Sequence, residues 1–357
     1  MTATADPQIE KKASKERYFS LVNKADSYFG ILGLSWVTPV LKMAGGDNLK
    51  ANSKEIWRLL CVPLLAIMLF LGAWGYMAPK VQTSLGAVPG PVQVWEQFQN
   101  LNDSHQRQKD KEAAFYQRQD DRNAKLIAQG KDDKVKFRKF TGAPTYYDQI
   151  WTSLFTVFFG FLLATIIAVP LGIAGGLSPM ISAGMNPIIQ IFKPVSPLAW
   201  LPIVTMVVSA TVTSAEPLLA KSFLVSAITV TLCSLWPTLI NTTLGVASID
   251  KELISVSKVL KLNTWTKITK LVLPSALPLI FTGLRLSLGV GWMVLIAAEM
   301  LAQNPGLGKF VWDEFQNGSS QSLAKIMAAV LTIGLIGYLL DRVMFALQSI
   351  FTFSADR

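Results

Sequence analysis

The stretch from Ser248 to Leu301 reads SIDKELISVSKVLKLNTWTKITKLVLPSALPLIFTGLRLSLGVGWMVLIAAEML, and it joins a charged loop to a long apolar run. In the loop, apolar residues recur three and four positions apart, which predicts a short amphipathic helix; they are Ile249, Leu253, Ile254, Val256, Val259 and Leu260. We predict a second short helix over Thr264 to Val272 that ends at Leu273-Pro274, because proline cannot continue the helical hydrogen bonds. Two such helices either suit a groove on another protein or lie flat on a lipid surface.

The whole chain has the composition of a membrane protein. Of its 357 residues, 51% are hydrophobic and only 16% charged, whereas soluble domains carry about 25% charged residues. Long stretches such as Ile150 to Ile191 and Phe223 to Ser248 contain almost no charge, as expected for segments in lipid. The net charge of +10 does not indicate nucleic-acid binding, because no basic-aromatic module or zinc-ligand cluster accompanies it.

Few residues in the sequence could support chemistry. The single histidine, His105, cannot build a metal site alone, and Cys61 and Cys233 lie in apolar runs. The apolar segments contain no paired carboxylates and no activated nucleophile, so we expect no catalytic residue and no metal or cofactor bound by this chain. The first apolar run begins near Leu59, too far from Met1 for a cleaved signal, and we expect a retained span there.

Six segments are long and apolar enough to cross a membrane, which takes about 20 residues. They are Leu59 to Ala78, Ile150 to Leu177, Pro187 to Ala210, Ser222 to Thr243, Ala276 to Ala302 and Ala324 to Leu347. The third is interrupted by Pro194, Pro197 and Pro202, and such breaks survive in a membrane only where protein or a watery cavity covers the backbone. The predicted fold class is an all-α polytopic membrane protein.

Basic residues predict the orientation. The arm before the first span holds nine Lys and Arg against six Asp and Glu, and the loop 248–274 holds five against two. The positive-inside rule places both in the cytoplasm. The predicted order is a cytoplasmic arm (1–58) with an interfacial helix near Phe29 to Met43, a first span (59–78), a periplasmic loop (79–148), a core of five spans (149–347) and a cytoplasmic tail (348–357).

The periplasmic loop carries a polar insertion. Glu96 to Phe140 holds eleven basic residues, yet long loops translocate largely regardless of charge. Its composition predicts an exposed helix or helical hairpin with little apolar surface to bury. We interpret it as a solvated insertion rather than as a dedicated docking device.

The loop before Leu273-Pro274 resembles the signature of permease subunits of binding-protein-dependent ABC importers: Glu-Ala-Ala, three residues, Gly, nine residues, then Ile, any residue and Leu-Pro. Anchored on Leu273-Pro274, the signature places Leu271 at the Ile, Lys261 at the Gly and Ser255-Val256-Ser257 at the triplet. The spacing and the Leu-Pro match, while the triplet and the glycine do not. Lys261 must therefore adopt a turn that glycine makes at little cost.

The flanking motifs resemble the nitrate, cyanate, bicarbonate and sulfonate branch of this family, and the nitrate permeases are the nearest match. These motifs are KPVSPLAWLP (193–202), FTGLR (281–285), AAEML (297–301), GLG (306–308) and WD (312–313). The resemblance covers about Tyr147 to Phe345, and the N-terminal arm and the Glu96 to Phe140 insertion lie outside it.

The resemblance implies a type I importer permease of a bacterial inner membrane. In this family two permease copies form the pathway, two cytoplasmic ATPase subunits bind ATP and Mg²⁺, and a periplasmic or lipid-anchored protein delivers the anion. The loop would transmit the ATPase movement through Glu252, Ile254, Ser255, Val256, Ser257, Lys258, Lys261, Leu262, Trp265, Leu273 and Pro274. The chain itself lacks a phosphate-binding loop, since Gly306-Leu307-Gly308-Lys309-Phe310 has neither the upstream glycine nor the hydroxyl that such a loop requires.

An anion that crosses a low-dielectric pathway needs cations or hydrogen-bond donors. The candidates in or near the spans are Lys193, Trp200, Trp236, Arg285, Trp292 and Glu299. Alternatively, Lys193 extends to the cytoplasmic interface, Arg285 forms a structural ion pair and each tryptophan serves in packing. Glu299 would repel an anion, so we interpret it as a gate or packing residue. Gly283, Gly289 and Gly291 fit a close approach of helices.

The predicted function is import of nitrate. Bicarbonate, cyanate, and taurine or another sulfonate are alternatives, because the binding protein largely sets selectivity in such importers. A stand-alone secondary anion transporter is a further alternative, but the inverted repeats and charged midplane sites common in that class are not clear in the sequence. A membrane-embedded enzyme ranks last, since the spans lack catalytic motifs.

Overall fold

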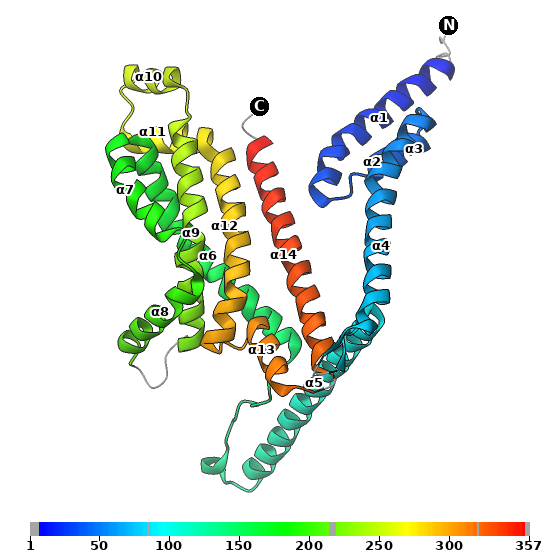
Figure 1. Ribbon diagram of the computed structural model, residues 1–357, viewed down its shortest axis with the longest axis vertical. Helices are drawn as coiled ribbons and strands as arrows, with labels where there is room; N and C mark the ends of the chain where they lie inside the picture. The colour runs from blue at the N-terminus through cyan, green and yellow to red at the C-terminus, as the bar shows by residue number, and fades with distance from the viewer. Residues whose placement is uncertain (1–6, 84–85, 214–218, 320, 354–357) are drawn as a thin grey trace.

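The computed structural model describes residues 7–83, 86–213, 219–319 and 321–353, and it consists almost entirely of helices (Figure 1). This confirms the predicted all-α fold class. The only strands among the described residues are β1 (Gln82–Thr83) and β2 (Gly86–Ala87), which form a small antiparallel ribbon. Residues 1–6 of the predicted arm and 354–357 of the predicted tail lie outside the described residues.

The N-terminal arm comprises α1 (Pro7–Leu32), α2 (Val37–Ala44) and α3 (Leu49–Ile56). The Thr38 hydroxyl donates to the Asp26 carboxylate at 2.7 Å, so α2 folds back on α1. The segment from Phe29 to Met43 is therefore not the single interfacial helix that the sequence predicted. Gly33, whose φ is +75°, separates α1 from α2, because this left-handed conformation ends a helix.

The first span begins with a distorted turn. A π-helical turn, Trp57–Cys61, leads from α3 into α4 (Val62–Met77). Pro63 is the second residue of α4, and the wider turn before it makes room for a ring that would otherwise clash with the preceding turn. In Figure 1, α4 stands apart from the other long helices, and its side chains are largely exposed within the single chain.

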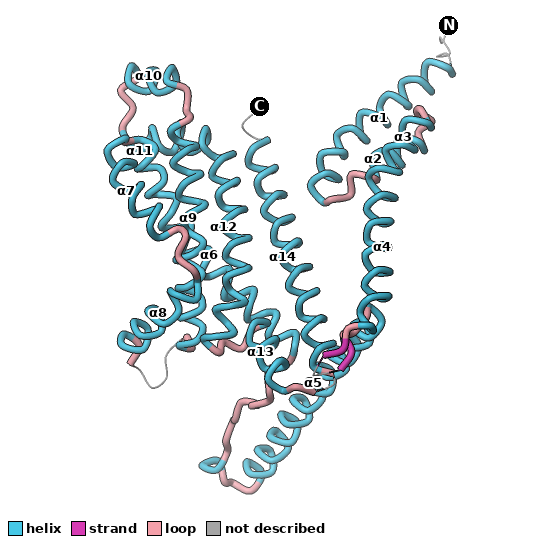
Figure 2. The backbone as a smooth tube through the Cα atoms, in the orientation of Figure 1, coloured by secondary structure: helices cyan, strands magenta, loops and turns pink. Residues whose placement is uncertain are grey.

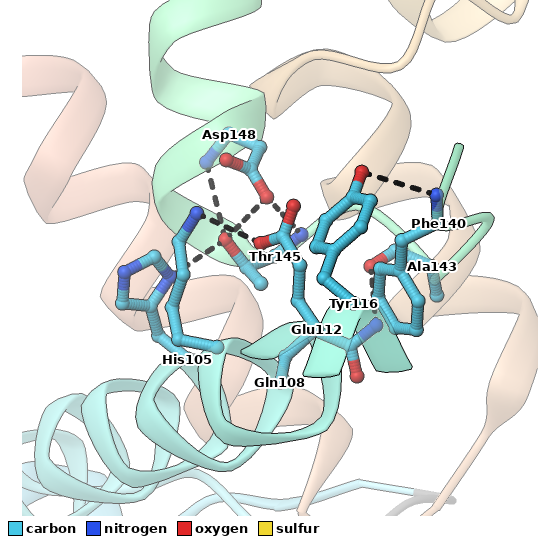
Figure 3. Close-up of polar contacts among 9 residues, drawn as sticks. His105, Gln108, Glu112, Tyr116, Phe140, Ala143, Thr145 and Asp148 are labelled. Atoms are coloured by element: carbon cyan, nitrogen blue, oxygen red, sulfur yellow. Dashed lines mark hydrogen bonds and ion pairs between the residues drawn. The ribbon is translucent and has the colours of Figure 1, made fainter. Parts of the chain in front are cut away.

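The polar insertion forms one long helix, α5 (Pro91–Ala128), and an extended segment that runs back along it. The Phe140 amide donates to the Tyr116 hydroxyl at 3.3 Å. At the base of the arm, His105 Nδ1 lies 2.9 Å from Thr145 Oγ1, as Figure 3 shows. The insertion is therefore an exposed helix with an extended return segment, and the alternative of a helical hairpin is wrong. Side-chain donors and acceptors on α5 take the place of a second helix as partners for the backbone of the return segment.

Three helices form the core of the bundle: α6 (Tyr146–Leu177), α9 (Lys221–Ala247) and α12 (Leu273–Ala302). They approach closely at glycines, since a Cβ on Gly160 would lie 2.7 Å from a carbonyl oxygen of α9, and one on Gly283 would lie 3.0 Å from another. A Cβ on Gly291 would meet a side chain of α9 at 3.3 Å. Gly289 faces open space, so the close approach predicted there is wrong.

The third predicted span consists of two helices, α7 (Pro179–Phe192) and α8 (Pro197–Thr211), bent by 101° at the break between them. The break falls at Pro194 and Ser196, where proline cannot donate a backbone hydrogen bond and Ser196 caps α8 by accepting from the Leu198 amide at 3.3 Å. Pro202 lies inside α8, so the interruption predicted there is wrong. Its missing N–H costs α8 only one hydrogen bond. Figure 2 shows the break as a loop midway along the bundle.

A short helix, α13 (Leu307–Asn317), and a long one, α14 (Ser322–Phe353), complete the bundle. Lys325 on α14 pairs with Glu314 on α13 at 3.0 Å. The Trp292 indole N–H donates to the Ile333 carbonyl at 3.0 Å and so joins α12 to α14. These contacts fix α14 along the outside of the core.

Five helical stretches among the described residues are long and apolar enough to cross a membrane, and the bent pair α7 and α8 makes a sixth. Their order along the chain agrees with the six predicted spans. In Figure 1, α1 to α3, the loop helix α10 (Lys251–Val259) and the C-terminal end of α14 lie at one end of the bundle. Helix α5 and its return segment, which together we call the α5 arm (residues 91–144), lie at the opposite end with α13.

Candidate functional site

The loop between α9 and α12 contains the predicted amphipathic helix as α10. Asp250 caps its start, because the carboxylate accepts from the Glu252 amide at 2.9 Å. The helix ends before Lys261, whose φ of +47° lies in the left-handed region. The Leu262 amide donates to the Ser257 carbonyl at 3.1 Å, which closes the end of the helix. The turn that the sequence predicted at Lys261 is confirmed.

The second loop helix is not a separate element. α11 (Thr264–Lys267) continues through a π-helical turn, Ile268–Val272, directly into α12. The predicted helix end at Leu273-Pro274 is therefore wrong. The π turn admits Pro274 without breaking the helix, as the similar turn before Pro63 does in α4. One continuous helix thus runs from Thr264, just beyond the turn that follows α10, into the core.

One face of α10 packs against the bundle. Ser257 is buried, and its hydroxyl donates to the Ile254 carbonyl at 2.6 Å. The Ile254 side chain packs in a cluster with Val272, Leu271 and Leu273. Ile254 is therefore an internal anchor of the loop rather than part of its outer surface.

The loop also exposes several apolar side chains. We call these residues the coupling surface: Leu253, Val256, Val259, Leu260 and Trp265. Val259 is 81% exposed and Trp265 is 73% exposed. The polar residues Glu252, Ser255, Lys258 and Lys261 are exposed as well. Several exposed apolar side chains on one short loop beyond the spans are typical of a contact site for another protein.

Two predicted pathway residues, Trp200 and Trp236, lie near the Phe192 ring at the break between α7 and α8, and a third, Lys193, follows Phe192 in the chain. Lys193 ends α7 directly before Pro194, and its side chain is exposed. The Phe192 ring centroid lies 5.7 Å from that of Trp200 and 6.5 Å from that of Trp236. The indole N–H groups of both tryptophans are buried without a hydrogen-bond partner in the described part of the chain.

Two other predicted pathway residues fasten α12 to α14. Trp292 uses its indole N–H in the bond to α14 described above. Arg285 forms a two-point ion pair with Asp341, and the second contact, Nη2 to Oδ2, measures 2.6 Å. The Arg285 guanidinium also lies 5.5 Å from the Phe345 ring centroid. Both side chains are thus committed to contacts within the chain.

Glu299 lies at the opposite end of α12 and is fully buried. The Ser153 hydroxyl donates to its carboxylate at 2.8 Å, and the Gly308 amide donates at 3.0 Å. A Cβ on Gly306 would overlap the same carboxylate. Glu299 therefore holds the glycine-rich turn that begins α13, which favours the packing interpretation. No sequence pattern marks Ser153 as its partner, because the two residues lie 146 positions apart.

The sequence of the bundle matches a known protein family. Residues 168–353 match the family described as "Binding-protein-dependent transport system inner membrane component", which is just over half of the chain. The chain belongs to this family. The match begins within α6 and includes the coupling surface and the break between α7 and α8, while the N-terminal arm and the α5 insertion lie outside it. As a member of this family, the chain is an inner-membrane component of a transport system that depends on a binding protein.

Two curated relatives within this family match a similar length of the chain. The nitrate import permease protein NrtB of Synechococcus elongatus is 36% identical over 196 residues, which are 55% of this chain and 66% of the relative. The bicarbonate transport system permease protein CmpB of Synechocystis sp. is 38% identical over 203 residues, which are 57% of this chain and 68% of the relative. The matches thus span about two thirds of the relatives' length.

A solved structure supports the fold assignment. A chain of the MetNI methionine ABC transporter, in an inward-facing conformation, matches with a TM-score of 0.50 at 15% sequence identity. The match covers 58% of this chain and 96% of that chain. At this identity it shows the fold alone, and that fold is the predicted type I importer permease.

Proposed function

We propose that this chain is the membrane-spanning subunit of an ATP-driven nitrate importer in a bacterial inner membrane. The observation that carries the proposal is the 36% identity over 196 residues to a nitrate import permease. Two copies of the chain form the pathway in this proposal, and two cytoplasmic ATPase subunits bind ATP and Mg²⁺. A periplasmic or lipid-anchored binding protein delivers the anion.

The coupling surface supports the proposed role of the ATPase subunits. Val259 and Trp265 expose apolar side chains at the end of the bundle, where a groove on a partner could enclose them. Behind this surface, Ile254 anchors α10 to the ends of α9 and α12. Movement of the partner would therefore displace α12 and shift the bundle between its inward-open and outward-open states.

The proposed orientation has the coupling surface in the cytoplasm. The N-terminal arm and the loop 248–274 both carry an excess of basic residues, and both lie at the same end of the bundle. The α5 arm then lies in the periplasm. Its many charges agree with a solvated position outside the membrane.

ATP binding on separate subunits is supported by the glycine-rich turn before α13. The Gly308 amide, which a phosphate-binding loop would offer to phosphate, donates to Glu299 at 3.0 Å. Lys309 pairs with Asp313 at 2.6 Å. A buried carboxylate at this turn would repel a phosphate group, so the turn serves the fold and not a nucleotide.

Bicarbonate is a second candidate substrate. The bicarbonate permease relative is 38% identical over 203 residues, which is as close as the nitrate permease relative. Both anions are planar, singly charged and rich in oxygen acceptors. A pathway that accommodates one can accommodate the other, and the binding protein would then decide which is delivered.

The test is uptake into proteoliposomes that contain this chain and its ATPase subunits, with ATP sealed inside and the binding protein outside. We expect labelled nitrate to accumulate only when ATP and both partners are present. Uptake of labelled bicarbonate without uptake of nitrate would establish the second candidate. Nitrate accumulation by the chain alone would show a stand-alone transporter and contradict the proposal.

A further inference from the structure

The helix α7 carries a polar stripe on an otherwise mostly apolar sequence. Ser182, Asn186, Gln190 and Lys193 follow each other at intervals of four, four and three residues, which places them on one face. The Gln190 side-chain amide donates to the Asn186 amide oxygen at 2.9 Å, so these two side chains are aligned along the stripe. Amide and ammonium groups in a span are costly against lipid, and such a stripe indicates a watery or protein-lined surface.

The stripe lines a cavity of about 300 Å³ between α7 and α9. The wall formed by α9 includes Ile240 and Thr243, which share a helical face with Trp236. Among the described residues that line the cavity none is acidic, whereas ammonium, amide and hydroxyl donors are present. This lining suits a small, negatively charged solute with oxygen acceptors.

Trp236 packs beside two residues that line this cavity. It is only 8% exposed, and its indole N–H has no partner in the described part of the chain. Met185 and Ile189, which line the cavity, pack on the cluster that contains Trp236. A buried N–H without a partner is uncommon in proteins, and it points to a ligand or water that occupies the site in the working transporter.

The stripe also has a position that suits transport. It ends at Lys193, where the helix breaks before Pro194 midway along the bundle (Figure 2). Its other end runs toward the end of the bundle that carries α10 (Figure 1). None of the ion pairs among the described residues involves Lys193, so its charge is not neutralised within that part of the chain.

We propose that the polar stripe of α7, together with Trp236 on α9, binds a small oxyanion during its passage through the inner half of the transporter. The inference rests on the proposed function, since it assigns the anion-contacting wall of that importer. Lys193 supplies the charge, Asn186 and Gln190 orient the oxygens, and the Trp236 indole donates one hydrogen bond. The site has no carboxylate, so an anion meets attraction without a repelling group.

The test compares three variants in the complete complex: Lys193→Met, Asn186→Leu with Gln190→Leu, and Trp236→Phe. Lys193→Arg and Lys221→Met serve as controls, because the first keeps the charge and the second removes a lysine at the far end of α9. Uptake of nitrate and of bicarbonate is measured in proteoliposomes. Co-purification of the ATPase and its stimulation by the loaded binding protein report assembly and coupling.

We expect Lys193→Met to lower nitrate uptake about tenfold while co-purification of the ATPase is unchanged, since a lost charged hydrogen bond has an effect of this order. Trp236→Phe and the double leucine variant should lower uptake severalfold and change the ratio of nitrate to bicarbonate uptake. Both lysine controls should stay within about threefold of the unmodified complex.

Uptake at the unmodified rate in all three variants would overturn the inference. Loss of ATPase co-purification in step with loss of uptake would also overturn it, because the stripe would then serve assembly, for instance against the second copy. If the unmodified complex moves bicarbonate but not nitrate, the proposed substrate fails, while the same variants still test the stripe with bicarbonate.

Discussion

The Ser153 hydroxyl on α6 donates to the Glu299 carboxylate on α12 at 2.8 Å, and the Ser153 oxygen also accepts from the Leu307 amide at 2.9 Å. One small side chain thereby joins two core helices and the start of α13. All three residues are buried, so none of these bonds is replaced readily by water.

Replacing Ser153 with Ala should destabilise the purified protein by about 1–3 kcal/mol, because the Leu307 amide and the Glu299 carboxylate both lose a buried partner. Thermal unfolding in detergent measures the change. Ser104→Ala is the matched control, since Ser104 is exposed on α5 and bonds only within its own helix. Equal melting temperatures for the two variants would contradict this account of Ser153.

Two glycines of α12 should respond in opposite ways to alanine. A methyl group on Gly283 would lie 2.8 Å from Asn241 Cβ, whereas one on Gly289 would meet nothing within 4 Å. Gly283→Ala should cost about 1–3 kcal/mol by forcing α9 and α12 apart. Gly289→Ala should be neutral or stabilise the helix by up to about 1 kcal/mol. Thermal unfolding again decides, and a Gly283→Ala protein as stable as its Gly289→Ala counterpart would refute the close approach.

Replacing lysine with glycine should change the stability of the loop in opposite directions at two positions that are three residues apart. Lys261 has a φ of +47°, so Lys261→Gly should stabilise the loop by about 1 kcal/mol. Lys258 lies within α10, where Lys258→Gly should destabilise by about 1 kcal/mol. Hydrogen exchange of the loop amides can report both changes. Slower exchange in Lys258→Gly than in Lys261→Gly would exclude this explanation.

Charge on the coupling surface should abolish partner binding without affecting the fold. Val259→Asp places a carboxylate on a residue that is 81% exposed, so we expect normal membrane insertion and loss of ATPase co-purification. Phe137→Asp, on the exposed α5 arm, is the control and should leave the complex intact. Ile254→Asp should instead reduce the yield of folded protein, because Ile254 packs internally. Retention of the ATPase by Val259→Asp would show that the partner binds elsewhere.

Swapping the charges of Arg285 and Asp341 should harm the protein less than removing the charge of one of them. Arg285→Gln or Asp341→Asn leaves one charge unpaired between α12 and α14, which should lower the yield of folded protein severalfold. The double exchange, Arg285→Asp with Asp341→Arg, should recover part of that yield. Size-exclusion profiles after detergent extraction provide the measurement, and a double variant worse than either single one would argue against the pair.

The spans and their order were predictable because lipid excludes charge over long segments. Apolar runs such as Ile150 to Leu177 and Ala324 to Leu347 must form helices in lipid to satisfy their backbone hydrogen bonds, and the structure contains helices over both. The break at Pro194 was also predictable, since this proline lacks a backbone N–H and Ser196, two residues later, can cap the next helix. The positive φ of Lys261 followed from its place in the family signature.

What the sequence did not predict depends on contacts between distant segments. Pro274 appears as a helix end in any local pattern, yet a π turn before it keeps the helix continuous. Likewise, Glu299 and Arg285 are both charged residues in one span, and the sequence does not identify their partners, Ser153 and Asp341. Such partners lie on other helices, and periodicity along one segment contains no information about them.

The π turn at Ile268–Val272 also determines how far α11 is rotated about the helix axis relative to α12. An α-helix rotates by about 100° per residue, so one surplus residue in a turn swings everything beyond it around the axis by that amount. The side chains of α11 are therefore rotated about the helix axis relative to the positions that an uninterrupted α-helix would give them. Removing one residue from this turn would rotate Trp265 and the rest of the coupling surface by about 100° around the helix axis relative to α12, even though every side chain that forms the surface was retained.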